Sequence, residues 1–342
     1  MTTSASLPAA LVQGREVAEA ALRAAVGRLD EGNRLVAFYH FGWSDAQGRP
    51  AAASSGKALR PILALLSARA ARVPQDVGLP GAASVELVHN FALVHDDLMD
   101  GDRERRHRAT AWTVFGPARA ILAGDAMLAL AHQVLLEVPG PMGAAAARLL
   151  ADTSQLLIRG QAEDLSFESR SEVSVDECLA MASGKTSALL ACAAAVGAQL
   201  AGSEEIAVGL HQYGWHLGLA FQLVDDLLGI WGDPAETGKP VLSDLRKRKK
   251  SLPVTAALAS GGPAAEELAE WLGRPARTDP DDEAELGRIA ALVETAGGRS
   301  WAHAEAERRS ILATEALDGL NLPADVSADL QAVARFVTRR RD

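Results

Sequence analysis

The spacing of apolar residues constrains the fold of this chain more than any other feature of its sequence. Apolar side chains recur every three or four residues along most of the chain, as they do from Val17 to Leu29 and from Leu179 to Leu190. This spacing places them on one side of an α-helix, whereas a half-buried β-strand needs strict alternation, of which the sequence has no sustained run. Only 4% of the residues are aromatic, and alanine and leucine dominate, which also favours helices. The sequence therefore predicts an all-α protein.

The predicted helices follow one another without a linker or an internal repeat. Their expected ranges are 10–29, 34–41, 58–71, 81–99, 113–137, 142–166, 174–201, 203–230, 252–260, a short acidic helix before residue 274, 283–317 and 323–341. Residues 42–56 are expected to form a loop, and Gly297–Gly298 leaves the continuity of the helix 283–317 open. We expect one domain over residues 1–342, a single large helical bundle over about residues 15–340 with a short flexible N-terminus.

Composition argues against several classes of protein. A net charge of −10 does not suit a general nucleic-acid-binding protein, so no nucleic-acid partner is expected. Cys178 and Cys192 lie in apolar helical stretches, which favours buried thiols over a disulfide or a zinc site. The N-terminus has no signal-peptide pattern, and the longest apolar stretch, 186–201, is short for a membrane span and is expected to be a core helix. We therefore expect a cytoplasmic protein with no transmembrane segment.

The first chemical signal is an acidic cluster at the end of a predicted helix. Asp96 and Asp100 are four residues apart and share one helix face, with Asp97 beside them. Carboxylates this close repel one another unless a cation neutralises them, and Mg²⁺ prefers such oxygen ligands together with substrate phosphate. A solvated acidic helix end is the alternative, but acids at a helix C-terminus oppose the helix dipole. The cluster therefore indicates a magnesium site.

A second acidic pair, Asp225 and Asp226, ends another apolar helix about 130 residues later. Two such clusters on facing helices can hold several ions with a diphosphate between them. The acids of residues 279–282 lie instead in a proline-broken loop, where a helix-capping turn is the simpler interpretation. The second pair thus extends the magnesium hypothesis.

Basic residues complete the pattern, and lysines are rare among them. Six of the 34 basic residues are lysines, at positions 57, 185, 239, 247, 249 and 250, beside glycines or acidic motifs. Lys57 and Arg60 open a predicted helix, and His89 lies two turns before Asp96 on about the same helix face. Lysine is a compact point charge suited to phosphate, so these positions predict phosphate contacts.

Together these motifs resemble those of the trans-isoprenyl diphosphate synthases, the polyprenyl synthetase family that includes farnesyl and geranylgeranyl diphosphate synthases. The family's DDxxD motif and following arginine pair are matched by Asp96, Asp97, Asp100, Arg105 and Arg106. Its other elements are matched in order by Lys57 and Arg60, His89, Lys185-Thr186, Phe221 to Asp226, and Lys239. Six ordered elements are specific, whereas each alone would be weak.

The resemblance implies an isoprenoid-synthase-like bundle around a central active-site cavity, and a homodimer. It implies a prenyltransferase that joins isopentenyl diphosphate to an allylic diphosphate and yields a short trans-prenyl diphosphate. About three Mg²⁺ ions would be bound by Asp96, Asp97, Asp100, Asp225 and Asp226. The allylic diphosphate would contact Arg105, Lys185 and Lys239, and isopentenyl diphosphate would contact Lys57, Arg60, His89 and Arg106. Thr186 and Gln222 would present oxygen dipoles to the developing carbocation.

Three positions depart from the family pattern. Gly229 stands where the second motif has its third acid. We therefore expect Asp225 to bind a metal ion, and do not expect a complete second motif. His107 follows the arginine pair where glycine is common. Arg339–Arg341 would be able to fold over a diphosphate, but a solvated basic tail is the simpler interpretation.

Two alternatives share part of this pattern. A class I terpene cyclase also ionises its substrate with Mg²⁺ and aspartates, but it does not need Lys57, Arg60 and His89 for a second diphosphate. A non-catalytic subunit of a heteromeric synthase is the other alternative, prompted by Gly229.

Phe91 and Ala92 are the expected determinants of product length. Phe91 lies five residues before Asp96, about 7.5 Å along the helix axis. A large ring there would form the floor of a tunnel for the growing chain, while Ala92 is small enough to let the chain pass. A bulky residue at this position resembles the geranylgeranyl (C20) pattern, with farnesyl (C15) as the close alternative. A core aromatic without such a role is the plainer interpretation of Phe91.

Overall fold

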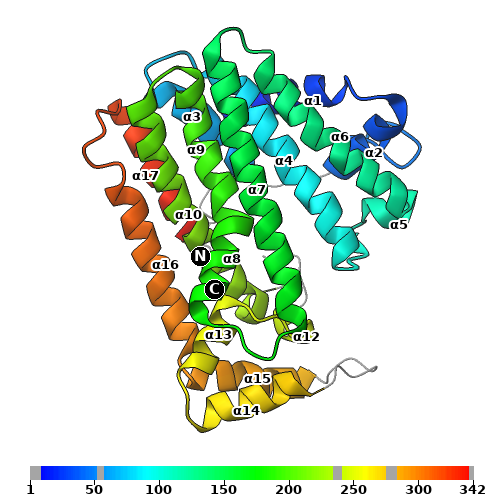
Figure 1. The fold of residues 1–342 in the computed structure, drawn as a ribbon, viewed down its shortest axis with the longest axis vertical. Helices are drawn as coiled ribbons and strands as arrows, with labels where there is room; N and C mark the ends of the chain where they lie inside the picture. Colours follow the sequence, from blue (N-terminus) through cyan, green and yellow to red (C-terminus); the bar gives the residue numbers. More distant parts are fainter. Residues whose placement is uncertain (1–8, 52–57, 234–240, 275–282, 339–342) are drawn as a thin grey trace.

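Long helices run side by side through most of the molecule (Figure 1). The structure, a computed structural model, describes residues 9–51, 58–233, 241–274 and 283–338. The helices of the first half are α1 (Ala9–Val26), α2 (Glu31–Phe41), α3 (Leu59–Ala70), η1 (Gln75–Gly78), α4 (Leu79–Met99), α5 (Ala111–Phe115), α6 (Pro117–Leu136) and α7 (Pro141–Ser169). Those of the second half are α8 (Val175–Ala182), η2 (Ser183–Ser187), α9 (Ala188–Leu200), α10 (Glu204–Trp231), α12 (Ser243–Arg246), α13 (Leu252–Ala259), α14 (Pro263–Gly273), α15 (Glu283–Thr295), α16 (Gly298–Glu315) and α17 (Ala324–Thr338). The all-α prediction is confirmed.

Helix α9 lies at the centre of the bundle, packed against α3, α4, α7 and α10. Nearly all of its residues are buried, and six of the 13 are alanine, which lets the neighbouring helices approach closely. The expectation of a core helix over 186–201 is therefore confirmed. Cys178 and Cys192 are both buried free thiols, as predicted. The largest apolar core includes residues of α3, α4, α9 and α10, and the C-terminal parts of α4 and α10 carry the predicted acidic motifs.

A smaller group of helices packs below the main bundle (Figure 1). There α12, α13, α14 and α15 surround the end of α10 with a core of their own, centred on the fully buried Trp271. This core places α12 beside the second acidic pair on α10. The lower helices therefore form one wall of the predicted site.

The structure differs from the predicted elements at several places, among them two glycines that break helices and a hairpin that was not expected. The helix expected over 113–137 is broken at Gly116, whose φ of 89° a residue with a side chain rarely adopts, and Pro117 then starts α6. Gly297, with φ of 84°, likewise separates α15 from α16. A short hairpin, β1 (Glu104–Arg105) and β2 (Arg108–Ala109), follows α4. Four residues of strand give no detectable alternation, which is why the sequence did not indicate them.

The predictions for several segments lie outside the described residues. These are Lys57, Lys239, residues 279–282, the N-terminal residues 1–8 and Arg339–Arg341.

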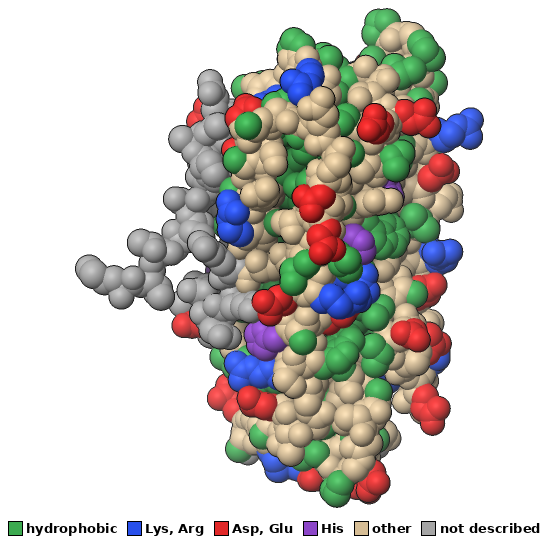
Figure 2. Space-filling view, turned by 90° about the vertical axis from the view of Figure 1, so that its left-hand side faces the viewer, with side chains coloured by type: hydrophobic (Ala, Val, Ile, Leu, Met, Phe, Trp, Pro, Cys, Tyr) green, Lys and Arg blue, Asp and Glu red, His purple; other side chains and the backbone are tan. Residues whose placement is uncertain are grey.

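The surface carries charged side chains of both signs. Figure 2 shows acidic and basic side chains interspersed over one face, with small apolar patches between them. Helix α6 is different, because Ile121, Leu122 and Leu136 are exposed along it. Three segments, Gln75–Met99, Pro117–Leu136 and Val175–Leu200, are long and apolar enough to cross a membrane by length and composition alone. The first and third are mostly buried in the bundle, whereas the second is less buried. The expected absence of a transmembrane segment therefore stays a prediction.

Candidate active site

The first acidic cluster lies where α4 ends. Asp100 caps the helix, and its backbone N–H donates to the carbonyl of Asp96, so Asp96 and Asp100 lie one turn apart. Asp97 points elsewhere: it is only 1% exposed, and its Oδ1 accepts a 2.7 Å hydrogen bond from Nε of Arg105. Burial raises the pKa of Asp96 and the pKa of Asp97 to about 6. At this helix end, Asp96 and Asp100 thus lie on one side and Asp97 points toward Arg105.

Lys185 is the basic group closest to the Asp96 side of the cluster. Its Nζ donates to Oδ2 of Asp164 at 2.6 Å, and its charge lowers the pKa of Asp96 against the effect of burial. Lys185 lies in η2, a π-helical turn between α8 and α9, the kind of helical irregularity that often marks a functional site. The turn packs very closely on α7, since a Cβ on Gly160 would lie 2.4 Å from the backbone nitrogen of Lys185. Glycine at position 160 therefore places Lys185 beside the acids.

The second acidic pair belongs to a chain of hydrogen bonds that begins at Thr186. The Thr186 hydroxyl donates to Oε1 of Gln222 at 2.6 Å, and Nε2 of Gln222 donates to Oδ1 of Asp226 at 2.7 Å. The other oxygen of Asp226 accepts from the backbone N–H of Leu252 at 2.9 Å. Burial raises the pKa of Asp226 to about 6. Asp225 is half-buried beside it, less enclosed than Asp226.

Lys249 lies partly buried among the acidic groups. Asp226, Asp164, Asp244 and Asp225 all raise its pKa against the opposing effect of burial. The sequence drew attention to Lys249 only as one of six rare lysines and assigned it no role. Its four acidic neighbours come from helices α7, α10 and α12, and this convergence cannot be read from spacing along the chain.

Asp244 occupies the space that a side chain at Gly229 would need. A Cβ built on Gly229 would lie 2.4 Å from Oδ2 and 2.5 Å from Cγ of Asp244. Ser243 fixes this approach, because its hydroxyl donates to the carbonyl oxygen of Gly229 at 3.2 Å. The acid missing from the second motif is thus replaced in space by one from α12, fifteen residues further along the chain.

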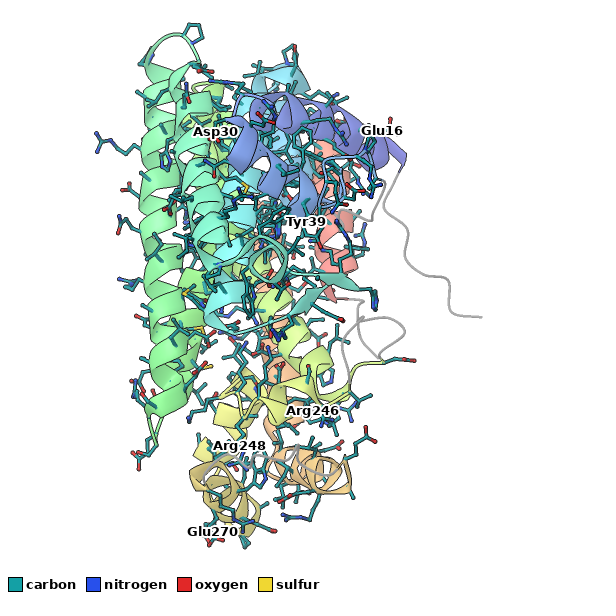
Figure 3. The ribbon with its side chains drawn as sticks, turned by 90° about the vertical axis from the view of Figure 1, so that its right-hand side faces the viewer. Glu16, Asp30, Tyr39, Arg246, Arg248 and Glu270 are labelled. Carbon is teal, nitrogen blue, oxygen red and sulfur yellow. The ribbon has the colours of Figure 1, made fainter. Side chains whose placement is uncertain are left out.

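The arginine pair is held by the hairpin that follows α4. Arg106 and His107 form its turn with φ of 52° and 59°, which fits a type I′ turn and explains why glycine would suit position 107. Arg108 anchors the hairpin to the end of α2 by donating to the carbonyl of Tyr39 at 2.9 Å, while the Tyr39 hydroxyl donates to the carbonyl of Ala109. In Figure 3, Tyr39 lies above the segment that carries Arg246 and Arg248.

Arg60 and His89 form a separate basic group near Arg106. Arg60 is the second residue of α3, and its Nε is buried without a hydrogen-bond partner. Burial lowers the pKa of Arg60, and burial together with Arg60 and Arg106 keeps the pKa of His89 well below its usual value. The nearest acid is Glu86 on α4, which partly offsets the charge of Arg60. A cavity lined by Asp97, Arg105, Arg106, Arg108 and the end of α2 adjoins this group.

The acidic residues fit divalent cations. Oδ2 of Asp97 is buried and has no hydrogen-bond partner. Burial makes the negative charges of Asp96, Asp97 and Asp226 unfavourable, and a bound cation would offset this free-energy cost. Within the described ranges, no three acidic, histidine or cysteine side chains converge closely enough to hold an ion by themselves. Ligands from a bound diphosphate would complete such a site, as is usual for Mg²⁺.

Phe91 and Ala92 are both buried on α4. The Phe91 ring packs edge to face against His95, with centroids 4.8 Å apart, and Nε2 of His95 lies 3.1 Å from the carbonyl oxygen of Ile121 on α6. The position of Phe91 is therefore fixed by contacts between α4 and α6, one and a half turns before Asp96.

Known proteins share this architecture and these motifs. A model of the polyprenyl synthetase family matches residues 46–289. The chain belongs to this family. A (2E,6E)-farnesyl diphosphate synthase of Mycobacterium tuberculosis is 52% identical over 94% of this chain and 89% of its own length. A geranylgeranyl diphosphate synthase of the same species is 45% identical over 93% and 90%. A polyprenyl synthetase from Streptomyces coelicolor A3(2) superposes with a TM-score of 0.93 at 56% identity, covering 96% of this chain and 98% of that one.

For this polyprenyl synthetase, the sequence predicted the acids at the ends of α4 and α10 and the basic residues near them. It missed Asp164, Lys249, Asp244 and Glu86, which surround those residues. The scarcity of lysine was a signal for Lys249, and the presence of Gly229 was an indirect signal for Asp244. Asp164 and Glu86 give no such signal, because each is a single acid within a helix.

Proposed function

We propose that this protein is a trans-prenyltransferase that condenses isopentenyl diphosphate with an allylic diphosphate, a proposal supported by its similarity to farnesyl and geranylgeranyl diphosphate synthases. The observation that carries the proposal is the presence of two separate cationic groups. Lys185 lies beside Asp164 and Asp96, while Arg60, His89 and Arg106 form a second group near Glu86, further from the C-terminal end of α4. A terpene cyclase ionises a single diphosphate and would not need the second group.

The proposed reaction begins at the acidic ends of α4 and α10. Asp96, Asp100 and Asp225 would bind Mg²⁺ directly, with about three ions in all. Asp97 and Asp226 complete the acidic set while they accept hydrogen bonds from Arg105 and from the backbone of Leu252. Mg²⁺ supplies the positive charge that stabilises the departing diphosphate.

The protein's own groups then direct the chemistry. Lys185, Arg105 and Lys239 bind the allylic diphosphate, so its C–O bond breaks toward positive charge. The oxygens of Thr186 and Gln222, joined by a 2.6 Å hydrogen bond, face the allylic cation. Lys57, Arg60, His89 and Arg106 hold the diphosphate of isopentenyl diphosphate while its alkene attacks C1. Loss of a proton then gives a chain five carbons longer, and the apolar surroundings exclude water.

Product length is proposed to depend on Phe91 and Ala92. The two buried residues lie on α4, one to two turns before the acids that bind the diphosphate. A chain that extends from the acids along α4 would meet the Phe91 ring. We propose a geranylgeranyl product, with the farnesyl product as the alternative.

We propose that the protein acts in the cytoplasm and forms a homodimer. Ile121, Leu122 and Leu136 on α6 are exposed apolar side chains, and Leu122 is 59% exposed. A second copy packed on α6 would bury them, and this helix is also the least buried of the three most apolar segments.

The testing experiment is an assay of the purified protein with isopentenyl diphosphate and dimethylallyl, geranyl or farnesyl diphosphate, with and without EDTA. We expect chain elongation that disappears in EDTA and returns with added Mg²⁺. Cyclic hydrocarbons would indicate a terpene cyclase, and a lack of turnover until another subunit is added would indicate a regulatory subunit.

A further inference from the structure

The C-terminal turn of α2 lines the cavity that holds the arginine pair. Tyr39, His40, Phe41 and Gly42 form one wall, and Arg105, Arg106 and Arg108 lie opposite. Burial and the charges of Arg105 and Arg106 lower the pKa of His40 to about 3, so the ring is neutral at physiological pH. His40 thus faces three cations without adding a positive charge.

His40 is joined to α4 by a hydrogen bond of defined direction. The amide nitrogen of Asn90 donates to both the backbone carbonyl oxygen and Oε1 of Glu86, at 2.8 and 3.1 Å. The amide oxygen of Asn90 therefore faces Nε2 of His40, 3.1 Å away, and must accept a hydrogen from it. The neutral ring carries its hydrogen on Nε2.

Glu86, the third member of this chain, is the acid that faces Arg60. The charge of Glu86 raises the pKa of Arg60 against the effect of burial. The charges of Arg60 and Arg106 lower the pKa of Glu86, again against the effect of burial. Nε of Arg60 is buried and has no hydrogen-bond partner, and Glu86 is the acid whose charge acts on this guanidinium. The orientation of Glu86 in turn depends on the bond from Asn90.

We propose that His40, through Asn90 and Glu86, is a positioning residue for the second diphosphate site, the one that takes isopentenyl diphosphate. The inference rests on the proposed function. It goes beyond that function because none of these three residues belongs to the motifs that identified the site. Its physical basis is that a hydrogen-bonded chain orients Glu86, the acid whose charge acts on Arg60 and Arg106, while His40 itself lines the cavity that holds Arg106.

Two substitutions of His40 test the direction of the hydrogen bond. His40→Gln keeps an N–H donor near the position of Nε2, whereas His40→Asn keeps only a group near Nδ1. We expect His40→Asn to raise the KM for isopentenyl diphosphate about three- to tenfold, the effect of one neutral hydrogen bond, and to leave the KM for the allylic substrate unchanged. His40→Gln should remain near the wild-type value. His132→Asn, on α6, serves as the control for a histidine outside the site.

A double-mutant cycle with Asn90→Leu tests whether His40 acts through Asn90. If it does, the His40→Asn/Asn90→Leu variant should have the same KM for isopentenyl diphosphate as Asn90→Leu alone. Additive effects would overturn the inference, and so would equal changes in both KM values or the reverse order of the Gln and Asn variants. If His40→Asn does not fold, as judged by its thermal midpoint, Asn90→Leu alone must raise only the KM for isopentenyl diphosphate. Failure of the wild-type protein to turn over both substrates would instead overturn the proposed function.

Discussion

The ends of α4 and α10 carry the same local pattern, an apolar helix that finishes in adjacent aspartates, yet the fold completes them differently. At α4 the third acid, Asp100, is supplied by the same helix, one turn beyond Asp96. At α10 the equivalent position is Gly229, and Asp244 from α12 fills the space beside it. A sequence motif can therefore be incomplete along the chain and complete in space.

The second difference is the way in which the inner acid of each pair is held. Asp97 has one oxygen bonded to the side chain of Arg105 and one without a partner. Asp226 has both oxygens bonded, to Gln222 and to the backbone of Leu252. The inner acid of α10 thus has both oxygens occupied before any ligand binds, whereas that of α4 keeps one oxygen available to a ligand.

Removal of one acid from each end should give the largest effect. Asp96→Ala and Asp225→Ala should each lower kcat on the order of 10³-fold or more, because both ends stabilise the same leaving group. Steady-state assays of prenyl transfer measure this, with the exposed Asp318→Ala as control. Near-wild-type turnover in either variant would show that its helix end is not part of the site.

The two cationic groups should separate by substrate. Arg60→Ala should raise mainly the KM for isopentenyl diphosphate, and Lys185→Ala mainly that for the allylic diphosphate. Each loses a charge-assisted contact worth about 1.5–3 kcal/mol, which corresponds to roughly 10- to 150-fold. The two KM values are measured with the other substrate at saturation. Equal changes in both constants would contradict the division into two sites.

Gly229→Asp should harm the second metal site although it restores the motif's third acid. The new side chain would collide with Asp244, whose Oδ2 lies 2.4 Å from the position of a Cβ. We expect the Mg²⁺ concentration for half-maximal activity to rise about 10- to 100-fold. Gly229→Asp combined with Asp244→Gly should recover much of the loss. A single Gly229→Asp variant with wild-type Mg²⁺ dependence would show that Asp244 does not replace the missing acid.

Phe91→Ala tests whether the product chain runs along α4. Loss of the buried ring should lengthen the products by one or more five-carbon units and cost about 3 kcal/mol of stability. Chromatography of the dephosphorylated products measures the lengths, and Phe91→Leu should keep the wild-type distribution. Unchanged products from a folded, active Phe91→Ala variant would remove Phe91 as the tunnel floor.

The smallest effect concerns stability and pH in EDTA. The pKa of Asp96 is raised to about 6, above the value of about 4 for an unfolded chain, so the folded state binds its proton more tightly. The stability that this proton adds is present below about pH 4 and is lost as the pH rises through about 6. Thermal unfolding should therefore show wild type losing stability relative to Asp96→Asn over that interval. Parallel curves would contradict the raised pKa.

The sequence alone determined the helical class, most helix positions and the acids and cations at the helix ends. These features are local, because a spacing of three or four residues sets a helix face and neighbouring aspartates share one helix end. Gly116 shows the limit of this reasoning, since the apolar pattern continues across it while the backbone does not.

Tertiary structure alone decided how the acids are used. It turned Asp97 toward Arg105, placed Lys249 among acids from three helices, and brought Asp244 against Gly229. It also joined His40 to Asn90, fifty residues away. No periodicity along the chain records such contacts, because they depend on which helices pack together and at what distance, and packing of the whole apolar core decides that.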